Sequence, residues 1–144
     1  MQNILLADDD KDDALLFTEV LTELQQSVML EIVSNGEQLM VLLNAQSAKL
    51  PDIIFLDLNL PLKNGADCLK NIKSAETLKQ LPVVMFSTSY QPSIVQVLYE
   101  QGANYYIRKP NSFELLKLVI NKALTLTKES GISQPPLEKF VLST

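Results

Sequence analysis

The chain has 144 residues, 47% of them hydrophobic, and its 12 basic and 17 acidic residues leave a net charge of -5. This length predicts one domain with a real core and is too short for two ordinary domains. The acidic balance argues against nucleic-acid binding, because phosphate backbones attract clustered Lys and Arg. The apolar runs are far shorter than the roughly 20 residues that cross a bilayer, so we expect no membrane role and a cytoplasmic location.

Histidine is absent and cysteine occurs once. The lack of histidine excludes His metal sites and Ser-His or Cys-His catalysis by this chain. Cys68 cannot form an intramolecular disulfide, and it lies among Ala66, Leu69 and Ile72 in a helix-like segment. We therefore predict a buried structural thiol.

Apolar runs alternate with amphipathic segments along most of the chain. In chain order the pattern predicts a strand over 3–8, a helix over 11–26, a strand over 30–33, a helix carrying Leu39 to Leu43, a strand over 53–57, a helix over 66–74, a strand over 83–88, a helix over 92–102, a strand over 104–107 and a helix over 112–127. Five strands separated by helices predict right-handed crossovers and a parallel sheet with helices on both faces. The expected fold is a doubly wound (βα)5 sandwich.

The regular pattern stops after about residue 127. We expect a domain over 1–127 and a C-terminal linker and tail over 128–144. The tail holds a Gly- and Pro-containing stretch and a short apolar patch over 137–142. We interpret the patch as a loosely docked segment, and a peptide motif for a partner is the alternative.

Four of the predicted strands end in residues that handle phosphate or a cation. These residues are Asp8 and Asp9, then Asp57, then Ser87 and Thr88, and finally Lys109. Open α/β sheets bind ligands outside the carboxyl ends of their strands, so the four strand ends should converge on one pocket.

Three carboxylates in one pocket need compensation, because two like charges about 4 Å apart repel by about 4 kcal/mol at an effective dielectric near 20. Lys109 supplies one positive charge, so the three carboxylates retain a net charge of two negative units. A divalent cation with oxygen ligands and bound water would balance them, and magnesium suits such a site better than calcium. We expect Asp9 to bind the ion directly, Asp8 through water, and Asp57 and the backbone carbonyl of Asn59 to complete the protein ligands.

This set of groups suits phosphoryl transfer. Asp57 lies on the central strand of the group and is the expected nucleophile, while Lys109 and the metal neutralise phosphoryl oxygens. Ser87 is expected to donate a hydrogen bond to a further oxygen. If the register is off by one residue, Ser87 and Thr88 exchange these positions.

Four motifs in the same order and spacing resemble the response-regulator receiver domain, over roughly residues 2–126. The motifs are Ile4-Leu-Leu-Ala-Asp-Asp-Asp10, Asp57-Leu-Asn-Leu-Pro61 with Gly65, Pro82-Val-Val-Met-Phe-Ser-Thr88, and Lys109-Pro110. The resemblance implies a flavodoxin-like fold and a two-component phosphorelay in which Asp57 accepts a phosphoryl group from a histidine kinase or phosphotransfer protein. Such a chain catalyses only its own phosphorylation and dephosphorylation and is not an enzyme in the usual sense. The resemblance also implies a cis Lys109-Pro110 peptide.

Finer features are similar to stand-alone regulators that are paired with phytochrome-like kinases and lack an output domain. They are the acidic opening over 8–13, the Ser87-Thr88-Ser89 run and the segment from Ala103 to Pro110. Ser87 replaces the usual threonine, and Thr88 replaces a residue that is usually small. The bulk of Thr88 is expected to affect the lifetime of the phosphorylated state.

The resemblance also implies a switch. Ser87 should move toward a phosphorylated Asp57, and the ring of Tyr106 should fill the space that it leaves. The change should appear on the surface formed by the helix over 92–102, the strand over 104–107 and the helix over 112–127, where a downstream protein would bind. A homodimer is a further expectation, with Tyr99, Tyr105 and Leu118 as its contacts.

Two other functional hypotheses remain open. The chain could keep the receiver fold as an interaction module that is not phosphorylated. A flavodoxin-like cofactor binder is less favoured, because Asp8, Asp9 and Asp10 stand where a phosphate loop would be needed. We interpret Asp10, Asp12 and Asp13 as favourable charges in the first turn of a helix.

Overall fold

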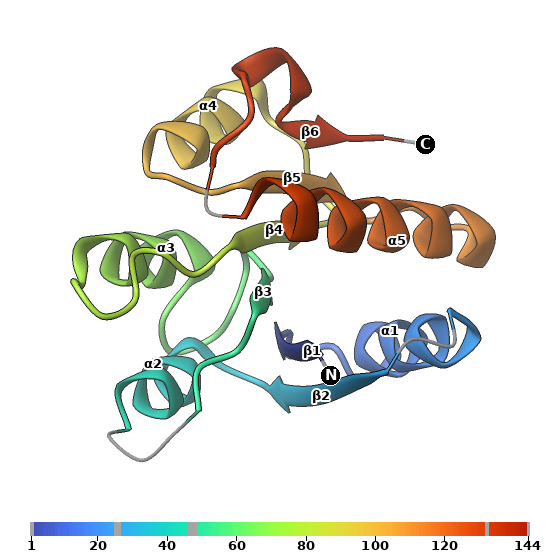
Figure 1. The fold of residues 1–144 in the computed structure, drawn as a ribbon, viewed down its shortest axis with the longest axis horizontal. Helices are drawn as coiled ribbons and strands as arrows, with labels where there is room; N and C mark the ends of the chain where they lie inside the picture. Colours follow the sequence, from blue (N-terminus) through green and yellow to red (C-terminus); the bar gives the residue numbers. More distant parts are fainter. Residues whose placement is uncertain (1, 25–26, 46–48, 132, 144) are drawn as a thin grey trace.

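Helices cover both faces of a parallel sheet in the computed structural model, which describes residues 2–24, 27–45, 49–131 and 133–143 (Figure 1). The strands are β1 (Gln2–Ala7), β2 (Val28–Val33), β3 (Ile53–Leu56), β4 (Val83–Ser87), β5 (Tyr105–Arg108) and β6 (Val141–Leu142). The helices are α1 (Lys11–Glu23), α2 (Gly36–Asn44), α3 (Gly65–Ser74), α4 (Pro92–Glu100), α5 (Phe113–Ser130) and the 3-10 helix η1 (Leu137–Lys139). The strand order is β2-β1-β3-β4-β5-β6.

Each face of the sheet has its own hydrophobic core. In β1, Leu5 and Ala7 face the core beneath α2, α3 and α4, while Ile4 and Leu6 face the core beneath α1 and α5. Figure 1 shows these two helical layers on opposite sides of the sheet. Because both faces are covered, every residue of β3 is buried. The predicted doubly wound, flavodoxin-like fold is confirmed.

The helix starts follow from capping residues in the sequence. The side chains of Asp10, Asn35, Asn64 and Ser112 accept hydrogen bonds from backbone N–H groups in the first turns of α1, α2, α3 and α5. Each cap contributes about 1 kcal/mol to stability. The helix ends were predicted less well: α5 continues to Ser130, and the predicted end of α1 at residue 26 lies outside the described residues.

The C-terminal segment departs from the prediction of five strands and a loosely docked patch. Val141 and Leu142 form β6, which pairs in parallel with Tyr106 and Ile107 at the outer edge of β5. Phe140, immediately before β6, is fully buried. The sequence could not indicate this sixth strand, because two residues are too few to show a period.

Two smaller expectations have opposite outcomes. Cys68 is fully buried, and burial raises the pKa of its thiol to about 11, so the predicted structural thiol is confirmed. The described residues contain no cis peptide bond, so the expectation for Lys109-Pro110 was wrong. The trans form of an X–Pro bond is favoured by about 0.5–1 kcal/mol. Within the described part of the chain, every helix is too short or too polar to cross a membrane.

Candidate functional site

A buried ammonium group lies at the centre of an acidic cluster at the carboxyl ends of the strands. The Nζ of Lys109 lies 2.9 Å from Asp8 Oδ2, 2.9 Å from Asp13 Oδ2 and 3.2 Å from Asp57 Oδ2. The same amine lies 4.8 Å from the centre of the Phe86 ring, a cation–π contact. The structure therefore brings together Asp8, Asp57 and Lys109, as the sequence predicted.

Backbone hydrogen bonds between neighbouring strands set these positions. Asp57 follows β3, and its N–H donates to the carbonyl of Ala7 at 2.9 Å, which places it beside Asp8 at the end of β1. Lys109 follows β5, and its N–H donates to the carbonyl of Ser87 at 2.7 Å. The convergence of strand ends thus follows from the parallel register of β1, β3, β4 and β5.

Asp13 is the site residue that sequence reasoning missed. It was assigned to the first helical turn, and the structure confirms this position, since Asp10 caps α1 and accepts from the backbone N–H of Asp13 at 3.1 Å. The carboxylate of Asp13 nevertheless contacts Lys109. The available signal was its place in the first turn after the strand that carries Asp8, where a side chain can reach back to the strand end.

The acidic cluster has the donor set of a hard metal ion. One carboxylate oxygen from each of Asp8, Asp9 and Asp57 lies within 4.8 Å of the others. Asp8 and Asp57 are buried, whereas Asp9 is exposed. Lys109 contacts the carboxylates of Asp8, Asp13 and Asp57, and Asp9 adds a fourth carboxylate nearby, so the cluster has an excess of negative charge. The residues therefore fit a divalent cation with oxygen and water ligands.

Burial and charge act in opposite directions on the ionisable groups. Burial raises the pKa of Asp8 to about 6, although the hydrogen bond from Lys109 opposes this rise. Burial also disfavours the charged form of Lys109, but the hydrogen bonds to Asp8 and Asp13 outweigh it and raise the pKa of the amine. Lys109 is therefore charged across the physiological range, and a neighbouring cation would favour the ionised form of Asp8.

The hydroxyl residues lie at the end of β4, beside the strand that leads to Lys109. Ser87 is fully buried at the end of β4, whereas Thr88 is exposed. The hydroxyl oxygens of Ser87 and Ser89 are 3.0 Å apart, and the backbone N–H of Ser89 donates to Ser87 Oγ at 3.2 Å. The hydroxyl of Tyr106 donates to the carbonyl of Ser89 at 2.5 Å. The buried hydroxyl is thus the one on Ser87, and hydrogen bonds connect it through Ser89 to Tyr106.

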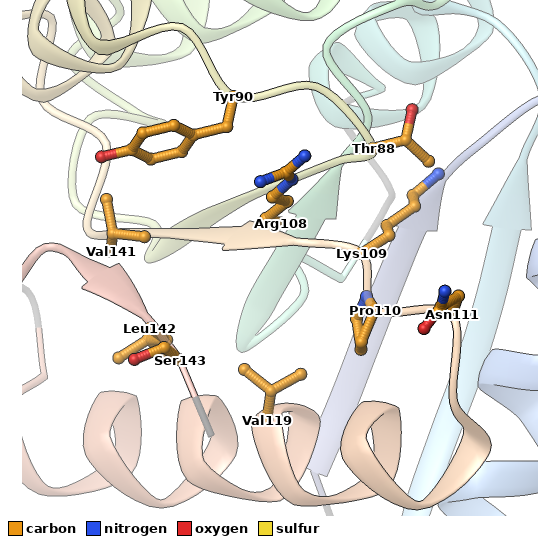
Figure 2. A pocket seen from close by; sticks show the side chains of 10 residues that line it. All are labelled: Thr88, Tyr90, Arg108, Lys109, Pro110, Asn111, Val119, Val141, Leu142 and Ser143. Atoms are coloured by element: carbon orange, nitrogen blue, oxygen red, sulfur yellow. The ribbon is translucent and has the colours of Figure 1, made fainter.

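A cavity of about 530 Å³ opens between the ends of β4, β5 and β6 (Figure 2). Thr88 and Lys109 line one side, while Val141, Leu142 and Ser143 line the side formed by the C-terminal segment. None of the aspartates lines it. The cavity therefore lies between Lys109 and the C-terminal segment.

Gly65 is required beside the site because of a close backbone approach. A Cβ at this position would lie 2.2 Å from the carbonyl oxygen of Asp57. We expect Gly65→Ala to lower the free energy of unfolding by about 1–3 kcal/mol through overpacking, and to displace Asp57. Urea unfolding measures the first effect. Lys70→Ala, at an exposed position of α3, is the control, and equal losses in the two variants would contradict the steric argument.

The fold and the acidic site define a class of signalling protein. Residues 4–121 match the response regulator receiver domain, so the chain belongs to this family, whose members act in two-component systems and are in general not enzymes. The chain is 37% identical over 121 residues to the response regulator Rcp1 of Synechocystis sp., a match that covers 81% of this chain and 82% of that protein.

Solved structures show the same likeness. The Mn²⁺-bound form of response regulator Rcp1 matches with a TM-score of 0.78 and 31% identity, covering 94% of this chain and 99% of that one. The phosphorylated cyanobacterial phytochrome response regulator RcpA matches with a TM-score of 0.80 and 33% identity, covering 93% and 98%. Both structures cover more than nine-tenths of this chain, so both matches extend beyond residue 121, where the family match ends.

Proposed function

We propose that the chain relays a two-component signal by accepting a phosphoryl group on Asp57 from a histidine kinase or phosphotransfer protein. The observation that carries this proposal is the contact of Lys109 Nζ with Asp57 Oδ2 at 3.2 Å, inside a cluster whose carboxylates need a second cation. A structural ion pair would need neither the excess of carboxylates nor the exposed position of Asp9.

In the proposed transfer, a carboxylate oxygen of Asp57 attacks phosphorus in line with the donor nitrogen. A P–O bond forms, the P–N bond breaks, and the electron pair of that bond stays on the donor nitrogen. Lys109 neutralises one phosphoryl oxygen, and the hydroxyl of Ser87 turns from Ser89 to donate to another. Thr88 is exposed beside this path and would limit the access of water to the acyl phosphate.

Magnesium is the proposed cofactor, and when bound it would neutralise charge on the phosphoryl oxygens. Asp9 would bind the ion directly, Asp8 through water, and Asp57 through its carboxylate. The backbone carbonyl of Asn59 would complete the protein ligands. The backbone N–H of Asn59 already donates to Asp57 Oδ1 at 3.0 Å, which holds this loop close to the nucleophile.

The partners follow from the relatives. Since RcpA is a phytochrome response regulator by its description, we propose a phytochrome-like kinase in the cytoplasm as the source of the phosphoryl group. The proposed output surface comprises α4, β5 and α5, with residues 1–127 as the receiver domain and 128–144 as a C-terminal linker and tail. Phosphorylation and dephosphorylation of the chain itself are the only reactions that we propose it to catalyse.

A homodimer on the same surface is also proposed, but with different contacts from those predicted. Tyr105 is buried, and Tyr99 packs against Phe140 with its ring centroid 5.1 Å away. Both side chains are therefore used within the chain, Tyr99 against the C-terminal segment and Tyr105 in the core beneath α1 and α5. Leu118 is 59% exposed and stays available.

The phosphoacceptor proposal is tested with a small phosphodonor. After incubation with acetyl phosphate and Mg²⁺, mass spectrometry should show a gain of one phosphoryl group, and chelation of the cation should prevent it. Glu76→Gln is a control variant, since Glu76 is exposed and forms an ion pair with Lys79, away from the acidic cluster. Binding of Mg²⁺ without any gain in mass would instead support a receiver-fold interaction module.

A further inference from the structure

The C-terminal segment, residues 133–143, is built against Tyr106. The N–H of Tyr106 donates to the carbonyl of Phe140 at 3.0 Å, and the centroids of the two rings lie 6.4 Å apart. Phe140 is fully buried, and it belongs to the core beneath α2, α3 and α4. Figure 1 shows this segment running past α4 to place β6 beside β5.

A second set of contacts fastens the segment to α4. The hydroxyl of Tyr99 donates to the carbonyl of Pro135 at 2.7 Å. The amide of Gln134 donates to the carbonyls of Tyr99 and Ala103 at 2.6 and 2.7 Å. These bonds, together with the contact between the rings of Tyr99 and Phe140, hold the segment at a point separate from the β5–β6 pairing.

The opposite end of the Tyr106 side chain reaches toward the phosphoacceptor site. Its hydroxyl donates to the carbonyl of Ser89, whose own hydroxyl lies 3.0 Å from that of Ser87. Tyr106 is only 1% exposed. The side chain is therefore buried, with its hydroxyl bonded to Ser89, the neighbour of Ser87, and its ring beside Phe140.

We propose that the C-terminal segment acts as a latch that keeps Tyr106 buried, with Phe140 as the positioning residue. The inference rests on the proposed phosphoryl acceptance by Asp57. If Tyr106 turned outward, Phe140 would lose a ring neighbour inside the core, so the segment contributes its packing only to the buried arrangement. Seating of the segment and occupation of the site by a phosphoryl group therefore favour the same state.

Coupling of this kind is reciprocal. A phosphoryl group on Asp57 must tighten the C-terminal segment by the same factor by which the seated segment strengthens binding of a phosphoryl mimic. The signalling face of the phosphorylated protein would then include η1 and β6, and not the bare edge of β5. A downstream partner would contact the side chain of Leu137, which is 44% exposed.

The experiment measures the affinity of the protein for beryllofluoride in the presence of Mg²⁺ by titration calorimetry. Phe140→Ala should weaken this affinity about fivefold or more, the usual lower range for coupling between two sites. Leu137→Ala, in the same segment, should match the wild type. Phe140→Leu retains apolar packing and should recover part of the affinity, and circular dichroism checks that each variant is folded.

A double-mutant comparison separates positioning from general stability. In a Tyr106→Ala background, Phe140→Ala should have no further effect on beryllofluoride affinity, because the side chain on which it acts is missing. Tyr99→Phe removes the hydroxyl contact with Pro135 and leaves Tyr106 intact. Tyr99→Phe should therefore also weaken beryllofluoride affinity. This variant replaces Phe140→Ala in the test if Phe140→Ala does not fold.

Hydrogen exchange provides the reciprocal measurement. Beryllofluoride with Mg²⁺ should slow exchange at the backbone amides of residues 137–142. Wild-type affinity in both Phe140→Ala and Tyr99→Phe, or an undiminished effect of Phe140→Ala without Tyr106, would overturn the latch while the phosphoacceptor proposal stands. If the wild type neither binds beryllofluoride nor gains a phosphoryl group, both proposals fail together.

Discussion

Asp57→Asn is expected to abolish the phosphoryl gain from acetyl phosphate and to stabilise the protein when no divalent cation is present. Phosphoryl acceptance should be lost because the side-chain amide of the substituted asparagine cannot form an acyl phosphate. The gain in stability follows from the charges around this side chain. Asp57 has carboxylates of Asp8 and Asp9 within 4.8 Å and only one cation, Lys109, at 3.2 Å.

The magnitude can be estimated from these separations. At an effective dielectric near 20, the repulsion from buried Asp8 is about 3.5 kcal/mol and the attraction to Lys109 is about 5 kcal/mol. The exposed carboxylate of Asp9 adds a weaker, solvent-screened repulsion, and the burial of Asp57 adds a desolvation cost, so the unfavourable contributions exceed the attraction. We expect Asp57→Asn to raise the free energy of unfolding by about 1–2 kcal/mol. The amide oxygen can still accept from the N–H of Asn59, so the loop should stay in place.

Chemical denaturation in a chelating buffer measures this effect, and intact mass measures the phosphoryl gain. Asp12→Asn is the matched control, since Asp12 lies in the first turn of α1 and is exposed. A variant that still gains a phosphoryl group would place the acceptor elsewhere. Unchanged or lower stability would mean that repulsion in the cluster is already relieved by other means.

Lys109→Met is expected to have the opposite effect on stability. Within the part of the chain that the structure describes, Lys109 is the only cation in ion-pair contact with Asp8, Asp13 and Asp57. Its removal leaves buried carboxylates without a partner, which typically costs about 3–5 kcal/mol. Phosphoryl acceptance should also be lost, because one phosphoryl oxygen would be left without its counter-charge.

Lys117→Met is a suitable comparison for Lys109→Met. Lys117 also pairs with a carboxylate, Glu23, at 3.1 Å, but both partners are substantially exposed. Exposed pairs contribute about 0.2–1 kcal/mol. The two variants should therefore differ by at least about 2 kcal/mol in the free energy of unfolding measured without divalent cation. Similar losses would contradict the central position assigned to Lys109.

The sequence anticipated the site better than the C-terminal segment, for a physical reason. Asp8, Asp57 and Lys109 each follow a strand that is buried and apolar, so both the strand and its end could be read from the residue pattern. Parallel strands place their carboxyl ends at one edge, and this rule brings the three side chains together before any coordinates are known.

No comparable sequence pattern predicted the contact of Asp13 with Lys109 or the contact of Phe140 with Tyr106. Asp13 is 96 residues from Lys109, and its position in the first turn of α1 equally suits a residue that only favours the helix N-terminus. Phe140 follows a Pro-containing stretch, and β6 has only two residues. Neither feature has a period from which a partner could be inferred.

The doubly wound sheet and the strand ends at which Asp57 and Lys109 lie could be inferred from the residue pattern alone, because burial on both faces of a parallel sheet imposes an apolar pattern on each strand. The tertiary structure alone decided that Asp13 joins Lys109 and that the C-terminal segment adds β6 beside Tyr106. Those contacts depend on the angle at which α1 leaves β1 and on a free edge at β5, and both are set by packing between distant parts of the chain.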